Sequence, residues 1–139
     1  MARALIAYLP RAGVPDRNAL QAALDTLKLK LTLDDGYVPL KSAGYLPCTF
    51  DGEDAGFTIR FHDVDADLNA LPQLKAALNG QDVAIDIKWG GDPREKVSAL
   101  GVAAAFAKDF GALVHDAASD KMLSADMLAK QARDEIETM

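Results

Sequence analysis

The stretch that decides the fold is residues 44–63, GYLPCTFDGEDAGFTIRFHD, in which two apolar runs flank an acidic turn bounded by glycines. The segment between the runs, residues 51–56, is DGEDAG. Glycine and aspartate supply the positive φ angles that a connection between antiparallel strands requires. The stretch therefore predicts a β-hairpin in the middle of the chain, with residues 51–56 as its connection.

Periodic segments on both sides of this hairpin predict further strands and helices. Apolar alternation or short apolar runs indicate strands at residues 4–9, 29–34, 83–89 and 112–115. Apolar spacing of three and four indicates helices at residues 17–28, 66–78, 93–110 and from 125 towards the C-terminus. Strands interspersed with about four helices predict an α+β fold, with a mainly antiparallel or mixed sheet covered by the helices.

The helix predicted from residue 93 has the clearest start in the chain. Asp92 suits the N-cap, Pro93 suits the first helical position, and Glu95 stands where it can reach back to the cap backbone. The preceding Trp89-Gly90-Gly91 lacks the spaced glycines and the lysine of a phosphate-binding loop. This loop is therefore predicted to be a tight turn that positions Asp92.

The composition indicates one domain spanning residues 1–139. A chain of 139 residues that is 50% hydrophobic buries about two-thirds of its unfolded surface as one domain. Its 21 acidic and 15 basic residues give a net charge of −6, which argues against a nucleic-acid partner. The first apolar run stops at Pro10, too short for a signal peptide or a membrane span, so we expect a cytoplasmic protein without a membrane partner.

The residues that could carry chemistry are few, and we expect no enzyme, no cofactor and no metal site. Cys48 is the only cysteine, lies in an apolar run and is expected to be a core residue. Asp63, Asp65 and Asp67 alternate as in a calcium loop, but Leu68 and Leu74 occupy positions that need glycine and a carboxylate. These aspartates are better explained as an acidic helix entry.

An alternative function rests on His62, His115 and Trp89. If the strands that carry the two histidines are neighbours, the two imidazoles could meet and move a proton or hold a metal. The chain would then be a small enzyme or ligand-binding domain with its site near these three residues. A third possibility is a subunit of a larger assembly.

An acidic surface that binds a protein partner is the favoured function. Six acids lie within a short span that contains a single base, Arg60. We expect them to gather at one end of the sheet and to attract a basic partner, with Trp89 as an aromatic anchor. The predicted partner-binding residues are Asp51, Glu53, Asp54, Asp63, Asp65, Asp67 and Trp89.

A family resemblance points the same way. The chain carries GYLPC at residues 44–48, glycines at 52 and 56, WGGD at 89–92 with Glu95, an alanine-rich helix and a short strand closing on Asp116. In these features it resembles small bacterial immunity proteins encoded beside secreted polymorphic toxins. The resemblance implies a protein that binds and neutralises a cognate toxin rather than catalysing a reaction.

Overall fold

The computed structural model describes residues 4–63, 81–116 and 121–138. Its seven strands are β1 (Ala4–Leu9), β2 (Leu31–Leu33), β3 (Ala43–Phe50), β4 (Glu53–Asp63), β5 (Val83–Lys88), β6 (Leu113–Asp116) and β7 (Lys121–Leu123). They form one sheet in the order β2-β3-β4-β5-β1-β6-β7, and every neighbouring pair is antiparallel. The predicted α+β fold with a central hairpin is confirmed.

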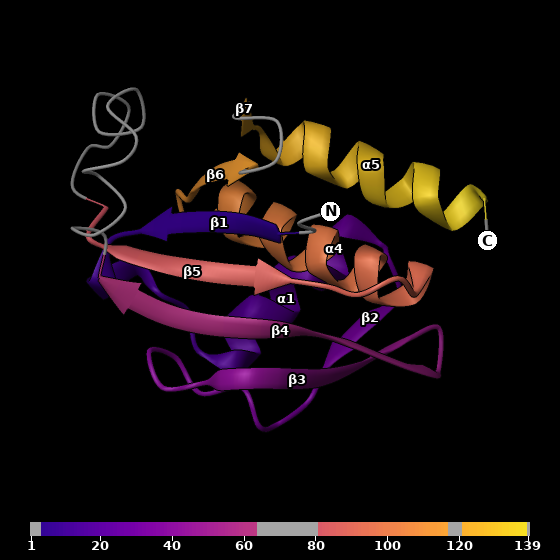
Figure 1. Cartoon of the computed structure of the whole chain (residues 1–139), viewed down its shortest axis with the longest axis horizontal. Coiled ribbons are helices and arrows are strands. Elements are labelled where there is room, and N and C mark those ends of the chain that lie inside the picture. The colour runs from indigo at the N-terminus through magenta and orange to yellow at the C-terminus, as the bar shows by residue number, and fades with distance from the viewer. Residues whose placement is uncertain (1–3, 64–80, 117–120, 139) are drawn as a thin grey trace.

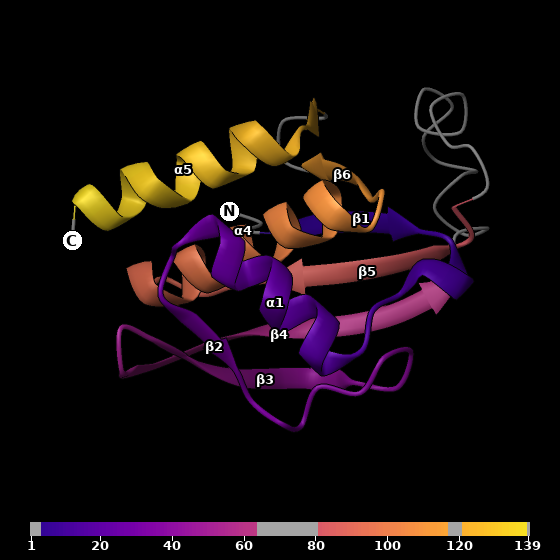
Figure 2. The same ribbon diagram turned by 180° about the vertical axis from the view of Figure 1, so that it is seen from behind.

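Three α-helices lie on one side of this sheet, as Figures 1 and 2 show. They are α1 (Arg17–Leu27), α4 (Pro93–Asp109) and α5 (Ala125–Glu137), and a short 3-10 turn, Arg11–Gly13, precedes α1. Helix α4 packs against the sheet and lies between α1 and α5, which both contact it. The described residues thus hold three α-helices where about four were expected, and the helix predicted at residues 66–78 lies outside them.

The helix starts follow the predicted caps. The side chains of Asp16, Asp92 and Ser124 each accept a hydrogen bond from a backbone N–H in the first turn of the helix that follows. In α1, the predicted stripe of Leu20, Ala23, Leu24 and Leu27 is buried. In α4, every residue from 97 to 106 is buried, because the sheet covers one face and the other two helices cover the rest.

The hairpin connection is shorter than predicted. Asp51 (φ 51°) and Gly52 (φ 82°) alone form the turn, and Phe50 pairs directly with Glu53. A two-residue turn with two positive φ angles matches the twist of the strands, so no longer connection is needed. Residues 53–56, expected in the connection, are instead the first residues of β4.

Two other strand predictions need correction. The strand predicted at residues 29–34 is limited to Leu31–Leu33, because Lys30 has a positive φ of 60°, although Leu29 is buried. Strand β7 was not predicted at all, since three residues are too few for an alternation to be recognised.

Candidate functional site

The sheet end where the β3–β4 turn meets the start of α4 holds a cluster of charged side chains centred on Arg94. The Arg94 guanidinium donates to Glu53 Oε2 at 2.8 Å, from the hairpin, and lies 3.3 Å from Asp92 Oδ2, from the helix cap. The hydrogen bonds that the guanidinium donates to Asp92 and Glu53 raise the pKa of Arg94. One arginine thereby ties the hairpin to the helix N-terminus.

Asp92 caps helix α4 and also binds the Arg94 side chain. Its Oδ1 accepts the backbone N–H of Arg94 at 2.8 Å, which caps α4 as predicted. This backbone hydrogen bond, followed by the one from the Arg94 side chain, lowers the pKa of Asp92. Asp92 is therefore held ionised by the backbone geometry of the helix start.

A groove of about 600 Å³ lies between the hairpin turn and α4. It is lined by Phe50, Asp51, Glu53, Gly91, Asp92, Pro93 and Arg94. Three carboxylates against one guanidinium leave the lining negative, while Phe50 and Pro93 add apolar surface. A groove of this composition suits a basic side chain with an aliphatic stem.

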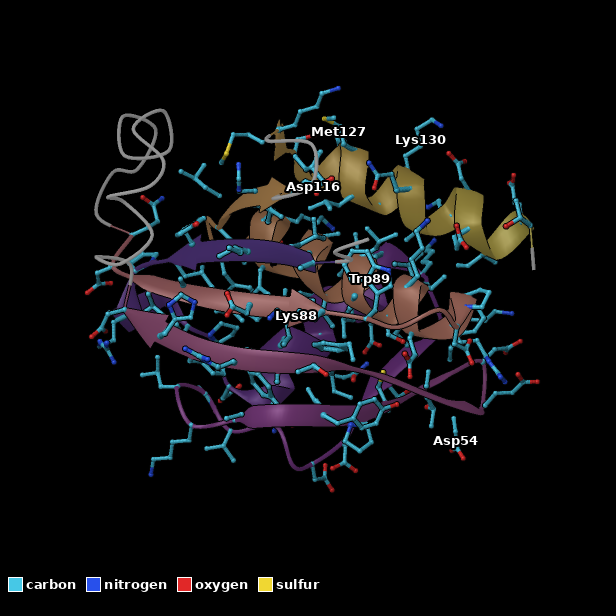
Figure 3. All side chains as sticks on the ribbon, in the orientation of Figure 1. Asp54, Lys88, Trp89, Asp116, Met127 and Lys130 are labelled. Atoms are coloured by element: carbon cyan, nitrogen blue, oxygen red, sulfur yellow. The ribbon has the colours of Figure 1, made fainter. Side chains whose placement is uncertain are left out.

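Trp89 stands beside this groove, at the end of β5, as labelled in Figure 3. It is half-buried and packs against the core. A second hollow of about 310 Å³ includes Trp89, Gly91 and Pro93 in its lining and reaches Glu135 of α5. The two hollows share Gly91, Asp92 and Pro93 in their linings, so they adjoin at the start of α4.

Tyr45 is the most exposed large apolar side chain described, at 56%. Its hydroxyl donates to the carbonyl of Ala55 at 3.0 Å and lies 3.5 Å from Glu95 Oε2. Burial of the hydroxyl, followed by the charge of Glu95, raises the pKa of Tyr45. The other oxygen of Glu95 accepts the N–H of Gly90 at 3.1 Å, rather than reaching the cap backbone as predicted.

The predicted acidic residues do not all gather at this end. Asp51, Glu53 and Asp54 lie at the start of β4 or in the turn before it, whereas Asp63 lies at the far end of β4. Ten residue steps along a strand correspond to on the order of 30 Å. The expectation of one acidic cluster is therefore wrong for Asp63, and Asp65 and Asp67 lie outside the described residues.

Several of these acids are already paired within the chain. Asp63 forms an ion pair with Arg11 at 2.9 Å, and Asp51 lies 3.8 Å from Lys30. Asp54 is exposed, and within the part of the chain that the structure describes its side chain forms no hydrogen bond or ion pair. Figure 3 shows Asp54 on the hairpin, towards the same end of the sheet as Trp89. Among the predicted acids that the structure describes, Asp54 is thus the one without an ion-pair partner.

The residues of the alternative site are kept apart. His62 is on β4 and His115 on β6, and β5 and β1 lie between them. The condition on which the two imidazoles could meet is therefore not fulfilled. His62 Nε2 lies 2.9 Å from Asp86 Oδ1. In the sheet, His62 pairs with Ala84 near the start of β5, whereas Trp89 follows the other end of that strand.

Cys48 is buried, as predicted, and burial raises the pKa of its thiol. Across residues 4–63, 81–116 and 121–138, no three histidine, cysteine, aspartate or glutamate side chains come together in a way that could hold a metal ion. No helix within these ranges combines the length and apolar character that crossing a membrane demands.

Comparison of the chain with protein-family models, curated proteins and solved structures yields no match.

Sequence reasoning included Trp89 and the hairpin acids in the candidate site but did not include Arg94 and Tyr45. Arg94 stands at the second position of α4, where a long cation next to an aspartate cap could have been expected to reach outwards. Tyr45 belongs to an apolar run of the sequence, and this pattern gives no sign that its side chain is exposed. Neither contact, to Glu53 or to Ala55, follows from a local pattern.

Proposed function

We propose that the chain is a protein-binding module, in particular an immunity protein that binds and neutralises a bacterial toxin with a basic surface. The observation that carries the proposal is the negatively lined groove of about 600 Å³ between the hairpin turn and α4. The groove is rimmed by residues from separate elements, and Arg94 holds those elements together. The proposed binding surface consists of the hairpin acids Asp51, Glu53 and Asp54 together with Arg94, Trp89 and Tyr45.

The side-chain types on this surface support protein recognition. Tryptophan, tyrosine and arginine dominate the binding energy of many protein interfaces. Tyr45, Trp89 and Arg94 are each fixed before any partner arrives: Tyr45 by Ala55, Trp89 by the core and Arg94 by two carboxylates. Surfaces that are already ordered lose less conformational entropy on binding.

The charge pattern supports a basic partner. The chain carries a net charge of −6, and the groove adds local negative potential to it. Opposite charge accelerates the encounter of two proteins and disfavours wrong partners. A toxin that acts on nucleic acids or nucleotides presents the matching positive surface.

The proposal is tested with the protein encoded by the adjacent reading frame. Co-expression of both chains should yield a stoichiometric complex on size-exclusion chromatography, and the chain should restore growth to cells that express that neighbour. Trp89→Ala should weaken the complex, whereas Lys121→Ala at the opposite edge of the sheet serves as the control and should not. A neighbour that neither binds nor harms cells would contradict the proposal, as would a small-molecule turnover by the chain alone.

A further inference from the structure

Along half of its length, the outer edge of β3 pairs with no other strand in the part of the chain that the structure describes. Strand β3 has eight residues, but β2 pairs only with residues 48–50. One further hydrogen bond runs from the N–H of Asp34 to the carbonyl of Pro47 at 3.2 Å. Beyond this bond, Ala43 and Tyr45 have no strand beside them on that side within the described residues.

The backbone groups of Ala43 and Tyr45 point outwards from the sheet. Phe50 and Glu53 flank a two-residue turn and form a hydrogen-bonded pair, and such pairs alternate with non-bonded ones along an antiparallel ladder. Leu46 and Gly44 therefore bond to β4, whereas residues 43, 45 and 47 face away from it. Proline at 47 fits this register, since a residue without an N–H cannot occupy a bonded position.

The neighbouring edge of β2 is closed by side chains. Gln21 of α1 donates from Nε2 to the carbonyl of Leu31 at 2.9 Å and accepts the N–H of Leu33 through Oε1 at 2.8 Å. Arg17 donates to the carbonyl of Leu33 at 2.6 Å. Natural proteins cover their sheet edges to prevent unwanted pairing, so the part of β3 that pairs with no described strand is unusual.

We propose that an extended segment of the protein partner adds to the sheet along residues 43–47 of β3. The proposal rests on the function proposed above and specifies how the partner is held. The two outward N–H groups and two outward carbonyls of Ala43 and Tyr45 would each find a main-chain partner, as in other cases of strand addition. The added segment would lie in line with β2 and end at Pro47.

The surroundings of this edge favour a basic segment over a second copy of the chain. The Tyr45 ring is exposed beside the edge, and the Glu95 carboxylate is 3.5 Å from its hydroxyl. A basic side chain next to Tyr45 therefore meets both an aromatic ring and a negative charge. Two copies of a chain with a net charge of −6 repel each other.

The first test is amide hydrogen exchange, followed by NMR, on the free chain and on its complex with the protein of the adjacent reading frame. We expect the Tyr45 and Ala43 amides to exchange rapidly in the free chain and to become protected in the complex. Protection in the free chain, rising with its concentration, would overturn the proposal in favour of self-pairing. Complex formation without protection of these amides would overturn it and leave the proposed function standing.

The second test removes one outward N–H. Ala43→Pro should weaken the complex about tenfold, since it deletes a hydrogen bond and places the proline ring against the added strand. Ala43→Thr keeps the N–H and should leave the affinity unchanged. Equal affinities of the two variants would contradict strand addition. If Ala43→Pro fails to fold, the exchange data on the unaltered chain decide, and a neighbour that does not bind at all would overturn both proposals.

Discussion

Gly56 has no side chain, and this leaves the space in which the Tyr45 side chain lies. Gly56 has a φ of 150°, and a Cβ atom built there would lie 2.7 Å from the carbonyl oxygen of Leu46 and would also collide with the Tyr45 hydroxyl. The backbone oxygen of Leu46 cannot move aside without disturbing the hairpin. Glycine is therefore required at this point for the close approach of β3 and β4.

We expect Gly56→Ala to lower the free energy of unfolding by about 1–3 kcal/mol, because of this overlap and the positive φ. Gly52→Ala is the matched control, since Gly52 also has a positive φ of 82° but has no atom within 4 Å of its virtual Cβ. The control should cost less than Gly56→Ala, because it has the positive φ without the overlap. Urea denaturation of both variants measures the difference, and equal losses would contradict the packing of Tyr45 over Gly56.

The lowered pKa of Asp92 predicts that the stability of the fold depends on pH. The pKa of Asp92 is lowered in the folded chain, so the folded state binds its proton less readily than the unfolded state. The resulting stabilisation is complete above the unfolded pKa of about 3.9 and is lost as the pH falls through the lowered folded pKa. Asp92→Asn preserves a capping oxygen but does not titrate.

We expect the unaltered chain to unfold at a higher urea concentration than Asp92→Asn at pH 6. The difference should shrink as the pH falls below about 4, where the carboxylate of the unfolded state becomes protonated. A difference that grows with acidification would contradict the assignment. Asp109→Asn, at the other end of α4, provides the control for a general loss of negative charge.

Helix α4 is the element around which the molecule packs. Ala104 is fully buried in it, with the sheet on one side and two helices on the other. We expect Ala104→Phe to overpack this contact and to cost about 1–3 kcal/mol of unfolding free energy. Lys108→Phe on the exposed part of the same helix should stay within about 0.5 kcal/mol. A stable Ala104→Phe variant in thermal and urea denaturation would mean that α4 does not pack closely at this position.

Elements with strong local patterns could be predicted from the sequence, and elements fixed by distant contacts could not. Asp92 and Pro93 announce the start of α4 because capping involves only neighbouring residues. The turn at Asp51-Gly52 was recognised, but its length depends on the strand pairing that follows. Strand β7 is defined by its pairing with β6 alone, and a three-residue strand carries too little pattern to be found.

At the scale of the whole molecule, strand order decides which predicted residues meet. The sequence predicts that Asp63 joins the hairpin acids because they are close along the chain. In the structure, Asp63 and Glu53 are at opposite ends of the eleven-residue strand β4. The sequence leaves open whether His62 and His115 meet, and two intervening strands keep them apart. The turn acids, Trp89 and the start of α4 come together because antiparallel β4 and β5 return the chain to the same end of the sheet.

This arrangement predicts that charge at the hairpin end steers the partner. Asp54→Lys changes an exposed carboxylate that has no ion pair in the described part of the chain, so the fold should be retained. Asp109→Lys makes the same change of charge at the far end of α4, about 25 Å along the helix from Asp92. Only the first variant alters the proposed binding surface.

The most direct measurement is the association rate of these two variants with the protein of the adjacent reading frame, by stopped flow at low and high salt. We expect Asp54→Lys to slow association severalfold at low salt and to weaken the dependence of the rate on salt. Asp109→Lys should follow the unaltered chain much more closely at both salt concentrations. Identical rates for Asp54→Lys and the unaltered chain at low and high salt would contradict the assignment of the hairpin end as the binding surface.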